Sequence, residues 1–107
     1  MSDFLIAPAA RVDLDEIWDY YAIEFQNPDA ADQIRDEIFA AFYKLVQMPG
    51  MGHPRHDLAA EPLRFWPVRN YLIIYRCEKR IIEIVRVLHG ARDMGAILAG
   101  AGAKPEK

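Results

Sequence analysis

The chain has a single cysteine, Cys77, so no disulfide can form within it. Because Cys77 lies in an apolar, strand-like segment, the pattern favours a buried structural thiol over a nucleophile. No apolar run approaches the roughly 18 residues that suggest a membrane span. The first ten residues also lack the basic start and long apolar stretch of a secretory signal. We therefore expect a cytoplasmic protein that makes no contact with a membrane.

Potential metal ligands are equally scarce. His53 and His56 lie in a segment beside Pro54 and Arg55, with no thiolate or second carboxylate near them in sequence. We therefore expect neither a metal site nor a cofactor.

Length and charge set the next limits. At 107 residues and 52% hydrophobic content, the chain has room for one core. We predict a single domain over residues 1–99, followed by a disordered tail, 100–107, of small and charged residues. Residues 1–50 carry a net charge of −7 and residues 51–107 one of +4. A cationic functional surface would lie in the second half, although acids on helices and arginines beside a sheet would give the same asymmetry.

The first half predicts two helices after a short strand at Phe4–Ile6. Proline at position 8 suits a first helical turn, and a helix is expected over about 8–25. Its apolar stripe recurs at three- and four-residue steps, and four acids are expected on its solvated side. The stripe is Leu14, Ile17, Trp18, Tyr21 and Phe25; the acids are Asp13, Asp15, Glu16 and Asp19.

A second helix is predicted to begin at Asn27-Pro28, where the asparagine side chain can cap free amides. Its buried face repeats at Ile34, Ile38, Phe42 and Leu45. It should end near Met48, because proline and glycine follow. With only two or so residues between them, the two helices must form an antiparallel hairpin.

The second half predicts a surface loop and three strands. Residues 49–62 hold three prolines and two glycines without apolar periodicity. Strands are expected over 63–68, 70–77 and 80–89, the last two joined by a tight turn at Glu78-Lys79 or by a slightly longer one. Pro67 would place the first of these strands at an edge.

Pairing around that turn predicts which residues share a face of the sheet. One set faces the helices: Tyr71, Ile73, Tyr75, Ile82, Ile84, Arg86 and Leu88. The other set is Leu72, Ile74, Arg76, Ile81, Glu83, Val85, Val87 and His89. Because one helical hairpin covers one side only, we expect a partner on the aliphatic part of the second face. Self-association, or cover by residues 94–98, is the alternative.

The segment RIIEIVRVLHGARD, residues 80–93, ends in a polar cluster. Arg86, His89 and Arg92 recur every three residues, so a strand end and a turn could gather cations at one edge of the fold. Arg86 could instead stack on Tyr71 or pair with an acid of the first helix. His89 could equally be a histidine at the edge of the core.

Four segments, in this order, resemble the ParE toxins of the RelE/ParE superfamily. They are PAARVDLDEIWDYY, MPGMGHP, LRFWPVRNYLIIYR and IIEIVRVLHGARD. The resemblance covers about residues 4–98 and implies an α+β fold of order β-α-α-β-β-β, with a helical hairpin packed on one face of a small antiparallel sheet. Ala7 departs from the family, which usually has serine or threonine before the first helix, and this weakens the N-cap by about 1 kcal/mol.

The resemblance implies the toxin of a type II toxin–antitoxin system that inhibits DNA gyrase and is not an enzyme. Its other partner would be a ParD-like antitoxin, whose extended or helical segment wraps it in a hetero-oligomer. Target contacts are then expected at Arg86, His89 and Arg92. Antitoxin contacts are expected at Trp66 of the edge strand and at five positions of the open sheet face: Leu72, Ile74, Ile81, Val85 and Val87.

Two other functions stay open. The RelE branch of the superfamily cuts messenger RNA on the ribosome, and a nuclease of that kind would use Arg64, Arg69, Arg86 and His89 here. A lysine cluster is missing, however, and apart from His56 no second proton-transfer group can be named. The third function is a nucleic-acid or protein interaction module. Direct binding of nucleic acid is disfavoured by the acidic pI of about 5.5 and by the few aromatic residues, Phe65 and Trp66, near the arginines.

Overall fold

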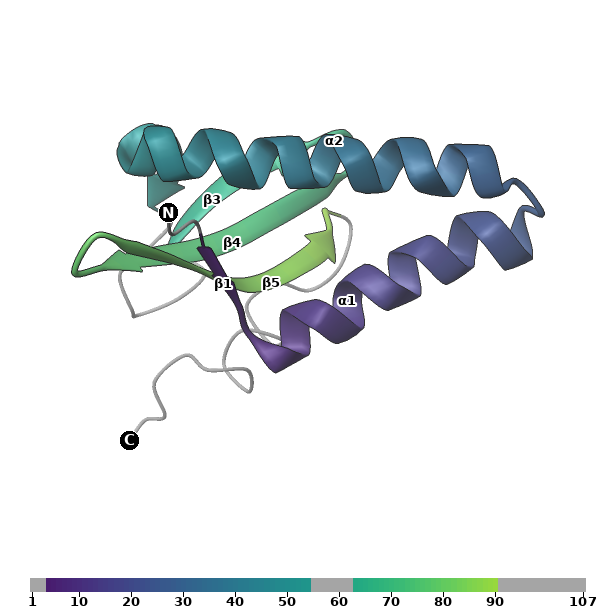
Figure 1. The fold of residues 1–107 in the computed structure, drawn as a ribbon, viewed down its shortest axis with the longest axis horizontal. Coiled ribbons are helices and arrows are strands. Elements are labelled where there is room, and N and C mark those ends of the chain that lie inside the picture. Colours follow the sequence, from purple (N-terminus) through teal and green to yellow (C-terminus); the bar gives the residue numbers. More distant parts are fainter. Residues whose placement is uncertain (1–3, 55–62, 91–107) are drawn as a thin grey trace.

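The computed structural model describes residues 4–54 and 63–90. It contains five strands, two α-helices, a π-helical turn η1 and a 3-10 turn η2 (Figure 1). In chain order these are β1 Phe4–Ile6, α1 Pro8–Asp19, η1 Tyr20–Glu24, α2 Pro28–Gln47, η2 Pro49–Met51, β2 His53–Pro54, β3 Arg64–Val68, β4 Tyr71–Glu78 and β5 Ile81–His89. The expected tail and residues 94–98 lie outside the described part of the chain.

The five strands form one sheet in the order β1-β5-β4-β3-β2. β3, β4 and β5 are antiparallel neighbours, as predicted, but β1 pairs parallel to β5. The expected antiparallel sheet is confirmed for β3, β4 and β5, and the parallel addition of β1 makes the whole sheet mixed. The parallel pair arises because α1 and α2 carry the chain away from β1 and return it on the same side. β2, a two-residue strand inside the expected loop, was not predicted; it pairs with Arg64 and Phe65 only, so β3 is an edge strand around Pro67.

α2 begins and ends where the sequence predicts, whereas α1 begins at Pro8 as predicted but ends at Asp19. Asn27 accepts a hydrogen bond from the amide of Ala30 at 3.1 Å, whereas Ala7 makes no side-chain cap. The first helix does not stay regular, because Tyr20–Glu24 form a π-helical turn. That turn closes with the amide of Phe25 donating to the carbonyl of Tyr20 at 3.1 Å. Two predicted side-chain positions differ from the structure: Phe25, at the end of this turn, is 60% exposed, and Asp13, in the regular part of α1, is buried.

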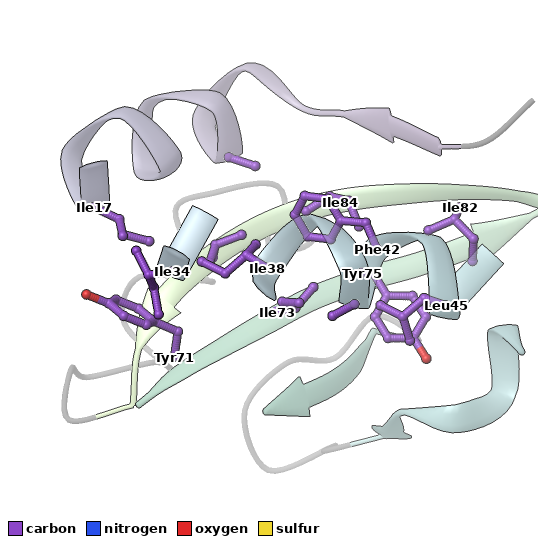
Figure 2. Packing of buried hydrophobic residues seen from close by; sticks show 13 residues of the cluster. Ile17, Ile34, Ile38, Phe42, Leu45, Tyr71, Ile73, Tyr75, Ile82 and Ile84 are labelled. Atoms are coloured by element: carbon purple, nitrogen blue, oxygen red, sulfur yellow. The ribbon is translucent and has the colours of Figure 1, made fainter. Parts of the chain in front are cut away.

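The main core lies between the sheet and the helices (Figure 2). Its members include Ile17 of α1, five residues of α2 and the helix-facing side of β4 and β5. Ala41 is one of the five, and the other four are the predicted Ile34, Ile38, Phe42 and Leu45, each at most 2% exposed. Tyr71, Ile73 and Tyr75 of β4 fall on the same face, as predicted. Burial of this apolar surface, at roughly 25 cal/mol per Å², is what fixes the helices on the sheet.

The β4–β5 hairpin turns one residue later than expected. Glu78 is opposite Ile81, so the two turn residues are Lys79 and Arg80, with φ of 53° and 68°. These positive angles are the conformation that a two-residue hairpin loop requires. Because the shift moves both strands together, Ile82 and Ile84 keep the predicted face.

A β-bulge overturns the face assignment in the second half of β5. Tyr75 is opposite Ile84, whereas Ile74 is opposite Arg86, so Val85 is the extra residue. Beyond it the faces exchange: Val87 packs in the main core and Leu88 packs on the other side. The predicted faces of Val87 and Leu88 are therefore wrong, because a one-residue insertion reverses the alternation of all residues that follow.

The other face of the sheet has its own buried cluster. Ile74, Val85 and Leu88 are at most 6% exposed and pack with one residue that precedes β3 and one residue of β3 itself. Those two are Leu63 and Phe65. The expectation that this face is open in the isolated chain is therefore wrong for its central residues. Cys77 is also exposed instead of buried, since it lies close to the hairpin turn, away from both clusters.

Candidate functional site

A buried ion pair joins α1 to the second half of β5. Asp13 is 4% exposed and accepts two hydrogen bonds from the guanidinium of Arg86, at 2.7 Å from Nε and 2.8 Å from Nη2. The same carboxylate accepts a third hydrogen bond from the backbone amide of Val87 at 3.0 Å. β1 pairs with β5 only as far as Ile84, so beyond it Asp13 takes the hydrogen-bonding place that a strand would otherwise fill.

The pairing decides between the two structural alternatives for Arg86. It pairs with an acid of the first helix instead of stacking on Tyr71. Its hydrogen bonds to Asp13 raise the pKa of Arg86, against the opposing effect of burial. The expected solvated position of Asp13 was wrong, although its spacing from Ala10 and Ile17 places it on the buried stripe of α1. That spacing is the signal by which this residue could have been found.

The remaining arginines of the nuclease hypothesis are also bonded within the chain. Arg69 donates to both carboxylate oxygens of Glu37, at 2.5 and 2.7 Å, and this hydrogen bonding lowers the pKa of Glu37. Arg64 donates to the backbone carbonyl of Gly52 at 2.8 Å. Arg64 and Arg69 lie at opposite ends of β3, about 16 Å apart at roughly 3.3 Å per residue. These cations do not converge on one phosphate.

His89 lies at the end of β5, edge-on to the ring of Tyr71 with centroids 5.5 Å apart. Burial raises the pKa of Tyr71, and a hydrogen bond with Tyr21 acts in the same direction. Tyr75 is 0% exposed; its hydroxyl accepts from the amide of Gly52 and donates to the carbonyl of Pro49, each at 2.8 Å. Both tyrosines are therefore held in the core as neutral residues, which argues against either of them as the second proton-transfer group of a nuclease.

Two of the candidate residues, Arg92 and His56, lie outside the part of the chain that the structure describes. Within residues 4–54 and 63–90, no three or more histidine, cysteine or acidic side chains are grouped as metal ligands. In the same part of the chain, no helix combines the length and apolar content needed to cross a bilayer.

The six positions expected to meet the antitoxin divide into two groups. Ile74, Val85 and Val87 are buried by the chain itself. Ile81 is 46% exposed, while Trp66 and Leu72 are partly buried. Three of the six are therefore accessible, and contact with an antitoxin at these three stays a prediction.

The comparisons with known proteins agree with this architecture. Residues 4–94 match the family model described as the ParE toxin of the type II toxin–antitoxin system parDE. Toxin ParE1 of Caulobacter vibrioides is 34% identical over 98 residues, which cover 92% of this chain and 99% of that protein. A chain in a structure of the chromosomal ParDE system from P. aeruginosa has the same fold, with a TM-score of 0.68 at 23% identity over 83% of this chain and 96% of that one.

The match of residues 4–94 to this family model, on a helical hairpin packed against a five-stranded mixed sheet, defines the class: this is the toxin component of a type II toxin–antitoxin system. Within that class, the chain belongs to the ParE toxin family. An antitoxin is therefore its partner, as the resemblance implied.

Proposed function

We propose that this toxin inhibits DNA gyrase by binding it and that it catalyses no reaction of its own. The observation that carries the proposal is the way its cations are used. Arg64, Arg69 and Arg86 each donate a hydrogen bond to a group of the chain itself. None of the three is therefore positioned to stabilise the five-coordinate phosphorus of an RNA-cleavage transition state. RNA cleavage needs an acid, a base and cations around one phosphate. An inhibitor needs only a shaped surface.

The proposed target contact is the end of β5, where His89 is exposed. Arg86 is only 16% exposed, so we assign it mainly to holding this strand end against α1 through Asp13. Arg92 follows three residues after His89 and is proposed as a second contact. Since gyrase acts on chromosomal DNA, the toxin would work in the cytoplasm.

Expression of the chain without its antitoxin, with DNA and protein synthesis followed together, tests the proposal. DNA synthesis is expected to fall first, and the purified chain is expected to block supercoiling by purified gyrase. An early arrest of translation, with supercoiling intact in vitro, would contradict the proposal and favour a ribosome-dependent nuclease.

His89→Ala tests the contact itself. We expect a loss of gyrase inhibition with antitoxin binding retained, because His89 lies at the surface and not in the core. His53→Ala, at an exposed histidine of β2, is the matched control and should keep full activity. If both variants inhibit gyrase as the parent chain does, His89 is not a target contact.

A further inference from the structure

The π-helical turn carries an exposed aromatic cluster. Tyr20 is 45%, Ile23 64% and Phe25 60% exposed, although soluble proteins normally bury large apolar side chains. The rings of Tyr20, Tyr21 and Phe25 contact one another, with centroids 4.9 to 5.8 Å apart. The cluster is thus ordered by its own packing. π-helical turns are rare and frequently mark functional sites.

Acidic side chains surround this cluster. A pocket of about 290 Å³ is lined by Glu16, Asp19, Tyr20, Ile23 and Glu24. Glu16 and Tyr20 also line a second, adjoining pocket of about 130 Å³. The far wall of that pocket includes Tyr71 and His89.

The residues that line the larger pocket form one surface, which we call the π-turn surface: Glu16, Asp19, Tyr20, Ile23 and Glu24. Three of these five residues are carboxylates at the level of the exposed rings, and residues 1–50 as a whole carry a charge of −7. A cation close to a tyrosine ring and a carboxylate is attracted by both. The apolar groups favour a partner that also brings aliphatic side chains. Phosphate backbones would be repelled.

We propose that the π-turn surface binds a segment of the cognate antitoxin in which lysine or arginine alternates with aliphatic residues. The aliphatic groups would cover Ile23 and Tyr20, and a cationic side chain would enter between Glu16 and Tyr20. The proposal rests on the antitoxin partnership of the family and not on gyrase as the target. It replaces the open sheet face as the main docking surface, because Ile74, Val85 and Val87 are already buried in the isolated chain.

Two variants remove the surface without touching the core. Ile23→Ala removes its most exposed aliphatic group, and Glu16→Lys reverses its charge. Each is expected to weaken binding of the purified full-length antitoxin about tenfold or more, the effect of a central interface residue. Without antitoxin, Ile23→Ala, which lies outside the pocket that contains His89, should stay toxic and keep the thermal midpoint of the parent chain.

Two control variants address the alternatives. Asp36→Lys makes the same charge change at an exposed position of α2 and should leave the antitoxin Kd within about twofold, since distant surface charges contribute little. Ile81→Ala tests the exposed edge of the sheet. A loss of affinity in Ile81→Ala, with Ile23→Ala unaffected, would overturn the proposal in favour of the sheet.

A charge exchange tests the chemistry of the partner. Reversing one lysine or arginine of the antitoxin to glutamate should weaken binding to the parent toxin and restore it to Glu16→Lys. If no such exchange rescues binding, the partner segment is not cationic at this point. If Ile23→Ala and Glu16→Lys lose toxicity while the antitoxin Kd is unchanged, the surface contacts the target and the proposal is wrong. Supercoiling by gyrase is measured separately, so either proposal can fail alone.

Discussion

Replacing Asp13 by leucine is expected to destabilise the fold by about 3–5 kcal/mol. The change leaves the guanidinium of Arg86 largely buried and without its carboxylate, and a buried charge stripped of its partner costs this much. It also leaves the amide of Val87 without its acceptor. A domain of this length has roughly 5–15 kcal/mol of total stability, so a large share would be lost.

The double variant Asp13→Leu/Arg86→Met is expected to be more stable than either single variant. Removing both charges removes the cost of burying them, and apolar replacements of a buried ion pair are often neutral or better. A residual loss of about 1–3 kcal/mol is expected, because the amide of Val87 remains unsatisfied. The energies of the two changes should therefore be strongly non-additive.

Urea unfolding followed by circular dichroism measures all three variants on one scale. Arg35→Met is the control, since its pair with Asp32 at 3.4 Å is more than half exposed and should contribute no more than about 1 kcal/mol. The reasoning is refuted if the double variant loses the sum of the two single losses. It is also refuted if Asp13→Leu loses no more than Arg35→Met.

Three further predictions concern other parts of the fold. Burial raises the pKa of Tyr75 in the folded chain above the unfolded value of 10.0. The neutral phenol therefore contributes its full stabilisation below pH 10.0, and this stabilisation is lost as the pH rises above that value, by about 1.4 kcal/mol per pH unit. Tyr75→Phe should remove that share of the alkaline slope in urea unfolding; an unchanged slope would refute it. Gly52→Ala should lose about 1–3 kcal/mol, because the added methyl would stand 2.6 Å from the Tyr75 hydroxyl; unchanged stability would show that the ring gives way. Lys79→Asn/Arg80→Gly should gain about 1 kcal/mol by relieving positive φ, and a lower thermal midpoint would contradict this.

The helices and the helix-facing residues could be predicted from the sequence because local signals define them. Asn27-Pro28 caps α2, and the apolar stripe of this helix extends from Ala31 to Leu45, about four turns, so the pattern is long enough to identify the helix and its buried face. β1 offers no comparable signal for its partner. Three apolar residues are compatible with either direction of pairing, and the choice is made by how α1 and α2 return the chain.

The bulge at Val85 could not be predicted, and it is the source of most errors at the candidate site. The sequence IIEIVRVLH, residues 81–89, is compatible with a regular strand as well as with a bulged one, because aliphatic residues fall on both faces. What favours the bulge is tertiary: Arg86 reaches Asp13, and Leu88 joins Leu63 and Phe65. Neither contact is visible in the spacing of β5 alone.

The pairing of β1 with β5 has a consequence for the time at which the toxin can become active during translation. β1 is synthesised first but can pair only with β5, so this edge of the sheet forms only after residues 81–89 have been synthesised. At about 5–20 residues per second, roughly 4–15 seconds separate their synthesis. The helical hairpin can form earlier from local contacts, as low contact order allows. The residues of the π-turn surface, proposed above to bind the antitoxin, are therefore synthesised seconds before the β5 end, which is proposed to contact the target.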